Sequence, residues 1–411
     1  MQGPTPVFDR AATTHHKKPF VRAGALFSAL LMLTVPFSTT ISIAMSFLVF
    51  ACWLLSSQCR TLPHLLRSNP VAASAMLLYG LFLIGTLYGD SGTNGSMSML
   101  RKYRELLLLV ILIPFLQEER YRRWMITAFI VGCVITLLGS YLKDLGILPP
   151  SRLGTATFKS WITHSLFMAF FGYYCAYQAS IMANRRWLWL GLLLLTAFNL
   201  FVVVQGRTGQ LIFILLMVLL FFQRFHARRA LILAPLLVVC IIGGLSISGV
   251  AIRFQEGIDN SRDYLSGRGN LDTSMGQRLY FWHHSVELIG ESPLIGYGTG
   301  SFAGQFSQIN NVEMQADNPH NEYLMIMVQL GVIGLIAYLY FLGCQWYYAV
   351  ELSEQRCWFA RGVVLALAVN SLLNSSFLDH TEGHWFSCLI ALSFAPLSRN
   401  GYKNDQPKIK M

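Results

Sequence analysis

Long apolar runs alternate with short polar connections along almost the whole chain. A helix needs about 20 residues to cross the hydrocarbon of a bilayer, and several runs are shorter than this, so their boundaries are loose. The stretch 187–222 is too long for one crossing and contains Gly206 and Gly209, so we expect two spans there. The pattern predicts an all-α fold, a polytopic transmembrane helix bundle of about 12 spans. The apolar runs cover residues 24–39, 41–57, 71–88, 103–116, 124–142, 161–182, 187–204, 209–222, 230–250, 320–343, 361–378 and 385–398.

One polar segment, residues 251–319, is far longer than the other connections. Within it, residues 274–290 place Leu279, Trp282, Val286 and Leu288 or Ile289 at helical spacing, which predicts an amphipathic helix lying against the membrane surface. The glycine-rich residues 296–301 (GYGTGS) predict a turn. We therefore expect an N-terminal tail (1–23), spans one to nine (24–250), a loop domain (251–319), spans ten to twelve (320–398) and a C-terminal tail (399–411).

The distribution of charge predicts the orientation of this bundle. Only 12% of the residues are charged and 54% are hydrophobic, which excludes an ordinary soluble globule. With the N-terminus inside, 20 of the 31 Lys and Arg fall in the inner connections, as the positive-inside rule requires. Both termini are then cytoplasmic, and the segment 251–319 lies outside. Most of the net charge of +11 is thus a topology signal, and we expect no nucleic-acid partner.

The eight cysteines predict neither a disulfide framework nor a metal site. None lies in the polar segment 251–319, and no CxxC or Cys/His spacing occurs. We expect no metal and no cofactor.

The remaining basic residues lie on the predicted outer side, against the topology bias. Cations at membrane depth usually have a partner or a role. Arg207, in the turn Gly206–Gly209, is either an arginine that extends to lipid headgroups or a bidentate clamp on a phosphate, which the flanking glycines would let approach closely. The other outer basic residues are Arg101, Lys102, Arg104, Lys143, Arg152, Lys159, Arg253, Arg262, Arg268 and Arg278.

Arg101, Lys102 and Arg104 open the short fourth apolar run. Arg101 could pair with Glu105 one turn on, or the three cations could face a polar ligand at the membrane's outer edge. Both interpretations stay open. With Lys159, these residues are candidates for guiding an acceptor's phosphates or for anchoring helices.

The segment Asp317–Leu324 (DNPHNEYL) is the second focus. Asn318 suits a helix N-cap and Pro319 the first helical position, which would place His320 in the first turn of a membrane helix. The helix dipole and nearby arginines both disfavour an imidazolium there, so a neutral His320 could act as a general base. Asn321 and Tyr323 follow it as candidate substrate contacts.

A short predicted outer turn, residues 378–385, gathers His380, His384, Asp379 and Glu382. This set could hold a metal, but a solvated turn is the simpler interpretation. Asp379 could also orient a basic residue of the site.

Four motifs, taken together, resemble the O-antigen ligase-like membrane protein family. They are an Arg-Thr-Gly turn at 207–209, Gln-Arg-Leu-Tyr-Phe-Trp at 277–282, Gly-Tyr-Gly-Thr-Gly-Ser-Phe at 296–302 and His-Asn-Glu-Tyr-Leu at 320–324. Each is weak alone, but their order and the single large loop before the histidine fit the family.

The resemblance implies a glycosyltransferase of GT-C-like fold in the bacterial inner membrane, with its active site on the periplasmic face. Family ligases transfer O-antigen from undecaprenyl pyrophosphate to a sugar of lipid A–core, completing lipopolysaccharide, and use no nucleotide sugar or metal. By motif match, Arg207 and Arg278 would bind the donor pyrophosphate and His320 would be catalytic. The implied partners are these two substrates and membrane lipids.

Two alternatives stay open at this point. An O-antigen polymerase of the same superfamily would use arginines equally well, although polymerases tend to carry two large arginine-rich outer loops, and this chain has one. A secondary transporter should hold its polar groups near mid-membrane, where only Asn370, Asn374 and Gln329 are candidates.

Overall fold

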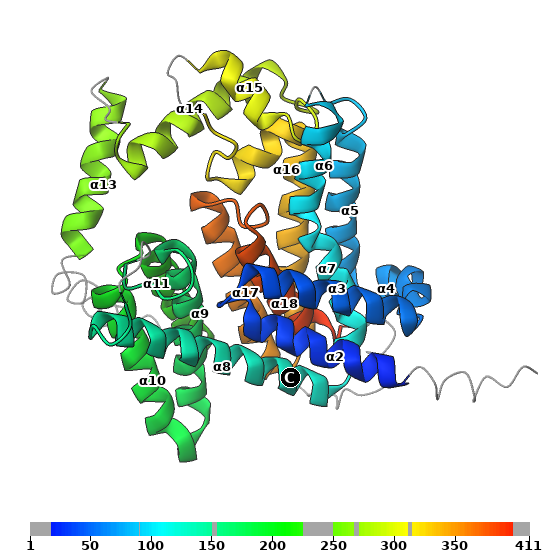
Figure 1. Cartoon of the computed structure of the whole chain (residues 1–411), viewed down its shortest axis with the longest axis vertical. Coiled ribbons are helices and arrows are strands. Elements are labelled where there is room, and N and C mark those ends of the chain that lie inside the picture. Colours follow the sequence, from blue (N-terminus) through cyan, green and yellow to red (C-terminus); the bar gives the residue numbers. More distant parts are fainter. Residues whose placement is uncertain are drawn as a thin grey trace, which may run out of the picture.

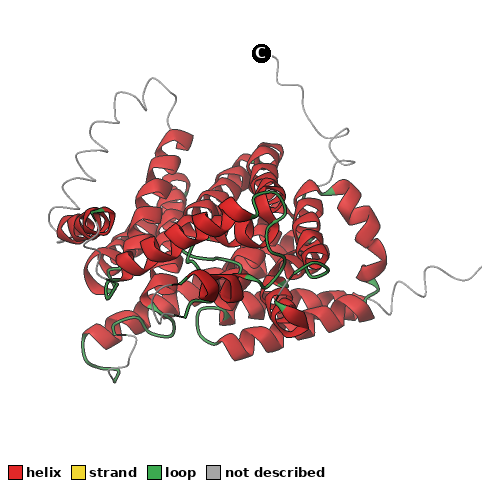
Figure 2. Ribbon diagram, turned by 90° about the horizontal axis from the view of Figure 1, so that it is seen from above, coloured by secondary structure: helices red, strands yellow, loops and turns green. Residues whose placement is uncertain are grey.

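The chain folds as a bundle of helices, and Figure 2 shows only helices and connecting loops among the described residues. The computed structural model describes residues 18–89, 91–149, 154–224, 250–266, 271–310 and 315–397. The helices are α2 (Lys18–Thr34), α3 (Thr39–Leu55), α4 (Leu62–Ser68), α5 (Pro70–Gly85), α6 (Gly92–Tyr103), α7 (Glu105–Leu112), α8 (Glu119–Asp144), α9 (Trp161–Ile181), α10 (Arg186–Phe198), α11 (Arg207–Arg224), α13 (Val250–Leu265), α14 (Ser274–Glu291), α15 (Phe302–Ile309), α16 (Glu322–Tyr348), α17 (Glu354–Leu373) and α18 (His380–Phe394).

The predicted all-α membrane bundle is confirmed. Within the described residues every predicted apolar run falls on a helix, and only the run 230–250 lies almost wholly outside them. In the part of the chain that the structure describes, five helices are long and apolar enough to cross a membrane, or six if the bent pair Thr39–Leu55 and Gln58–Ser68 forms one span. The count of about 12 spans and the division of the chain into tails, spans and loop stay predictions.

Many large apolar side chains are exposed on the outer surface of the bundle. Leu87 is 84% exposed, Trp187 82% and Leu194 69%. Such side chains expose far more apolar surface than a soluble monomer usually does, and a bilayer is the solvent that accommodates them.

The helices run alternately between two ends of the bundle. At one end, the start of α8 meets the start of α17, where Glu119 pairs with both Arg122 and Arg356. The end of α9 lies at the same end, because its last turn accepts hydrogen bonds from Arg186 at the start of α10 and Arg224 at the end of α11. Four of the basic residues assigned to the inner side by sequence thus lie at this end, which we call the basic end: Arg122, Arg186, Arg224 and Arg356.

The opposite end carries the helices of the long polar segment. Figure 1 shows α14 and α15 lying across the top of α16 and α6, while α13 descends beside α11. The predicted helix at 274–290 is present as α14, with Thr273 as its N-cap. Leu288 is buried as predicted, but the rest of the buried face differs, because Tyr280 and Phe281 are buried whereas Val286 is 59% exposed. α14 packs on α15 and α16 through that face, and this packing decides which side is buried.

The glycine-rich turn at 296–301 joins this upper layer to the bundle. The amides of Tyr297 and Gly298 donate to the carbonyls of Val328 and Gln329 in α16, and the amide of Thr299 donates to the Gly85 carbonyl at the end of α5. Gly298 has a φ of +86°, and a Cβ there would lie 2.2 Å from the Cα of Gly89. Only glycine allows this approach.

Candidate functional site

His320 lies in a loop directly before α16, close to its predicted place but not in a helix. Its φ is +54°, and α16 begins at Glu322 with Asn321 as its N-cap. The prediction that Asn318 caps the helix is wrong, because the Asn318 Oδ1 accepts instead from the His320 amide at 2.8 Å. Asn318 thereby stabilises a tight turn, in which the imidazole of His320 lies beside Asn374 at the end of α17.

Arg278 shares one face of α14 with the residues that touch the His320 loop. The indole of Trp282, four residues on, donates to the Pro319 carbonyl at 3.0 Å, and the ring of Phe281 lies 6.3 Å from the imidazole, centroid to centroid. Residues three and four apart lie side by side on a helix, so Arg278 is also directed toward this loop.

Arg207 is the first residue of α11 and reaches α13, where a Cβ at Gly257 would lie 3.3 Å from its Nη1. The flanking glycines do not serve the predicted approach to a ligand. A Cβ at Gly206 or Gly209 would collide with Ser165 of α9, at 2.3 and 2.5 Å. The glycines therefore let the start of α11 pack closely on α9, and that packing fixes the position of Arg207.

Electrostatic effects on pKa link Arg207 to Arg278, and Arg278 to His320. Burial, and then the positive charge of Arg207, lower the pKa of Arg278. Burial also lowers the pKa of His320, with a smaller downward effect from Arg278 that opposes upward effects from Asn374 and Asp317. Two guanidinium groups from different helices thus face a common region beside a histidine that stays neutral near pH 7. Guanidinium groups placed in this way suit the binding of a phosphate-like anion.

The cations that open the fourth apolar run divide between two surroundings. Lys102 forms an ion pair with Asp317 at 3.5 Å and so lies beside the His320 loop. Arg101 is exposed, and the pairing of Arg101 with Glu105 predicted from sequence is wrong. α6 ends at Tyr103 and α7 begins at Glu105, so the helical spacing that pairing assumed is broken, and Glu105 lies beside Arg104 instead.

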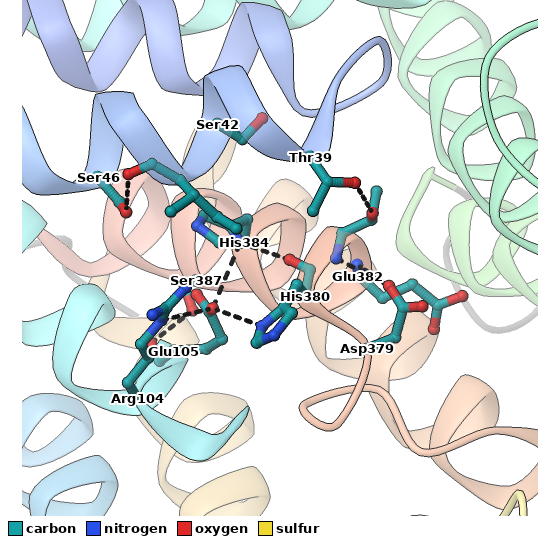
Figure 3. A network of polar contacts seen from close by, with 12 residues as sticks. Thr39, Ser42, Ser46, Arg104, Glu105, Asp379, His380, Glu382, His384 and Ser387 are labelled. Carbon is teal, nitrogen blue, oxygen red and sulfur yellow. Dashed lines mark hydrogen bonds and ion pairs between the residues drawn. The ribbon is translucent and has the colours of Figure 1, made fainter. Parts of the chain in front are cut away.

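Figure 3 shows the network around Glu105, with His380 and His384 of α18 directed toward its carboxylate. The Nδ1 atoms of His380 and His384 lie 3.6 and 3.3 Å from Glu105 Oε1, and Arg104 Nε lies 3.7 Å from the same oxygen. The interpretation of residues 378–385 as a solvated turn is wrong for His384 and Glu382, which are 1% and 0% exposed. Among the described residues, no three His, Cys, Asp or Glu side chains are arranged to hold a metal.

The remaining candidates have structural partners. Lys159 Nζ donates to Thr39 Oγ1 at 2.6 Å, and burial lowers its pKa while the charge of Asp379 opposes that effect. Asp379 caps α18 by accepting from the amides of Thr381 and Glu382, and Figure 3 shows it below Glu382. Asn321 caps α16, and the Tyr323 hydroxyl donates to the Ala368 carbonyl at 3.0 Å. Arg152 and Arg268 lie outside the described residues.

Comparison with known proteins bears on the segment that holds these residues. Residues 192–339 match the family model described as O-Antigen ligase, and this range contains Arg207, Arg278 and His320. The resemblance to the O-antigen ligase family is confirmed.

Two of the similar proteins carry the provisional name polysaccharide ligase. One, from Rickettsia felis, is 32% identical over 114 residues, and one from Rickettsia conorii matches with the same identity and length. In both cases the match covers 25% of this chain and 26% of the relative, so the chain spans about a quarter of those proteins. A Haemophilus influenzae protein, named only as uncharacterized, is 24% identical over 353 residues, which cover 78% of this chain and 84% of that protein.

The structure adds two residues to the candidate site that sequence reasoning did not assign to it. Asn374, at the end of α17, contacts His320, and Glu382 of α18 contacts Asn374. Sequence reasoning noted Asn374 only as a polar group for transport and Glu382 only as a metal ligand. A polar residue in an apolar run was the available signal, but which residue it faces depends on how α16, α17 and α18 pack.

Proposed function

We propose that this protein is an O-antigen ligase, which transfers O-antigen polysaccharide from undecaprenyl pyrophosphate to a sugar hydroxyl of lipid A–core. The observation that carries the proposal is the coupling of Arg207, Arg278 and His320 from three separate elements. The match of residues 192–339 to the family, and the names of the Rickettsia proteins, support the same reaction class.

The proposed step is a direct displacement at the anomeric carbon. His320 accepts the proton of the acceptor hydroxyl, whose oxygen forms the new bond to the sugar while the bond to the pyrophosphate breaks. The electron pair leaves with the pyrophosphate oxygen, and the guanidinium groups of Arg207 and Arg278 stabilise the charge that develops there. One displacement inverts the configuration of the anomeric carbon.

We place the site at the periplasmic face of the inner membrane, with both termini in the cytoplasm. Lys and Arg concentrate in cytoplasmic connections, and the basic end of the bundle is the end remote from α14 and His320. Membrane lipids would then surround the exposed apolar belt, and both lipid-linked substrates would enter from the bilayer.

Complementation of a ligase-deficient Gram-negative strain tests this function, with a lipopolysaccharide gel as the readout. The wild type should restore the O-antigen ladder, whereas His320→Ala, Arg207→Ala and Arg278→Ala should abolish it at equal membrane abundance. Arg185→Ala is the matched control, because Arg185 is an exposed arginine at the basic end, and it should restore the ladder. A full ladder from His320→Ala would contradict the assignment of the base.

The same genetic setting separates the ligase from an O-antigen polymerase. A ligase should attach O-antigen in a strain that lacks only ligase, and it should not extend the glycan chains of a strain that lacks only polymerase. Restored chain extension in the second strain would favour the polymerase. A transporter would restore neither phenotype.

A further inference from the structure

A chain of hydrogen bonds runs from the imidazole of His320 into the core of the bundle. The His320 Nδ1 lies 3.4 Å from the Asn374 Oδ1, and the Asn374 Nδ2 donates to the Glu382 Oε2 at 2.9 Å. The three residues come from the loop before α16, the end of α17 and the first turn of α18. The distance of 3.4 Å is at the long end of hydrogen-bond range, as is common for catalytic contacts before the substrate binds.

Glu382 is built into the fold as an acceptor. Its side chain is fully buried, and its carboxylate also receives hydrogen bonds from Asn370 Nδ2 at 2.7 Å and from Thr163 Oγ1 at 3.2 Å. Donors from α9 and α17 therefore converge on one carboxylate of α18. Three donors offset part of the free energy that burying this group costs.

This arrangement fixes the orientation of the Asn374 amide. The Asn374 Nδ2 donates to the Glu382 Oε2, so the other end of the amide, Oδ1, faces the imidazole of His320. An oxygen facing Nδ1 can only accept, so the proton of the neutral imidazole lies on Nδ1. Nε2 is then the unprotonated nitrogen.

We propose that Asn374 and Glu382 are positioning residues that hold His320 in the Nδ1–H tautomer, leaving the Nε2 lone pair for the acceptor hydroxyl. This inference rests on the proposed function, in which His320 is the general base. When Nε2 takes the hydroxyl proton, the new imidazolium keeps its Nδ1–H bond to the Asn374 oxygen, and the proton stays on the imidazolium until the product leaves. Glu382 acts through the amide of Asn374, whose Nδ2 donates to its Oε2.

The other charged groups facing His320 define the background for a test. Arg278, from α14, disfavours the imidazolium, whereas Asp317, from the preceding loop, favours it and is paired with Lys102 of α6. None of these contacts passes through Asn374. A variant of Asn374 should therefore change the titration of His320 while these influences stay in place.

The test uses the full-length protein in lipid nanodiscs, with lipid-linked O-antigen and lipid A–core as substrates. Asn374→Ala should lower kcat at least about 10-fold with little change in KM, because it removes the group that orients the base. It should also move the acid limb of the kcat/KM profile to lower pH, because the Asn374 hydrogen bond favours the imidazolium. A purely structural role would lower the amount of folded protein without moving that limb.

An exchange of the two side-chain types gives a second, independent measurement. Asn374→Asp alone removes the amide that donates to Glu382 Oε2, and Glu382→Gln alone puts an amide NH₂ where an acceptor oxygen can stand, so each should lose activity. In the double variant Asn374→Asp/Glu382→Gln, an aspartate would accept from Nδ1–H while the glutamine donates to it. We expect its kcat to exceed that of either single variant and its acid limb to lie above that of the wild type.

Asn69→Ala is the matched control, because Asn69 is a fully buried asparagine near the end of α18, with its amide on the Phe394 carbonyl. It should lower thermal stability and leave the acid limb unchanged. Wild-type kcat and acid limb in Asn374→Ala would overturn the proposal, as would a double variant no better than Asn374→Asp. If His320→Ala is inactive in the same assay while the Asn374 and Glu382 variants behave as wild type, this inference fails and the proposed base stands. Activity in His320→Ala would refute both.

Discussion

At the scale of single residues, neighbouring charges decide what His320 can do. Its ordinary pKa of 6.5 is lowered by burial and by the positive charge of Arg278. A lowered pKa keeps the imidazole neutral, so the base is available throughout the neutral range and is lost only as the pH falls through that pKa. Arg278, which we propose to bind the leaving group, would therefore also tune the proposed base.

We expect Arg278→Gln to change both the rate and its pH dependence. The rate should fall roughly 10- to 150-fold, because one charge-assisted contact to the pyrophosphate contributes about 1.5–3 kcal/mol. The acid limb of kcat/KM should move to higher pH than in the wild type, since the charge that disfavours the imidazolium is gone. Initial rates between pH 5 and pH 8 measure both effects, and an unshifted limb would contradict the coupling of Arg278 to His320.

At the scale of helices, the sequence predicted where each helix lies along the chain better than it predicted the residues at which each helix begins and ends. Apolar runs located the helices of the bundle because charge is expelled from lipid whatever the tertiary fold. The break between α6 and α7 and the start of α16 at Glu322 were not predictable, because each depends on a side chain used elsewhere. The Glu105 carboxylate lies 3.3 Å from the His384 Nδ1, and the Asn318 Oδ1 accepts a hydrogen bond from the His320 amide.

In the candidate site, too, some residues could be proposed from the sequence and others could not. Arg207, Arg278 and His320 could be predicted because basic and titratable residues on the outer side conflict with topology and match family motifs. Asn374 and Glu382 could not be placed, because their partners lie on other helices. The face of α14 that is buried was likewise decided by α15 and α16, not by its own spacing of apolar residues.

The glycine-rich turn makes a prediction at this scale. Gly298→Ala places a Cβ against Gly89 at a positive φ, so it should lower the free energy of unfolding by about 1–3 kcal/mol. Gly304→Ala in α15 is the control, because a Cβ there meets nothing within 4 Å and alanine favours a helix. Thermal unfolding in detergent should separate the two variants; equal melting temperatures would show that the turn does not constrain the fold.

At the scale of the whole molecule, the two ends of the bundle differ in kind. One gathers the ion pairs of Glu119 with Arg122 and Arg356, and the other carries α14 and the loop of His320. Exposed apolar side chains, among them Leu87, Trp187 and Leu194, cover the outer surface of the bundle. This polarity is what a membrane enzyme requires if its chemistry belongs to one compartment and its anchoring charges to the other.

Cysteine labelling in intact cells tests this polarity. In a background with Cys59 and Cys357 changed to serine, Gly290→Cys should react with a maleimide that cannot cross the inner membrane. Ala183→Cys should react only after the cells are permeabilised. Gly290 and Ala183 are both exposed, and a Cβ at Gly290 meets nothing within 4 Å. Labelling of Ala183→Cys in intact cells would reverse the proposed orientation.

The contacts of the glycine-rich turn also limit how relatives can exchange parts. The turn at 296–301 fits the end of α5 and the middle of α16, where Gly331 adopts a φ of +62° and lies against the Leu294 carbonyl. A chimera that receives only the segment 251–319 from a similar protein would contain the turn without the residues against which it packs. Swaps that carry the residues around Gly85–Gly89 and Val328–Gly331 together with that segment should remain foldable.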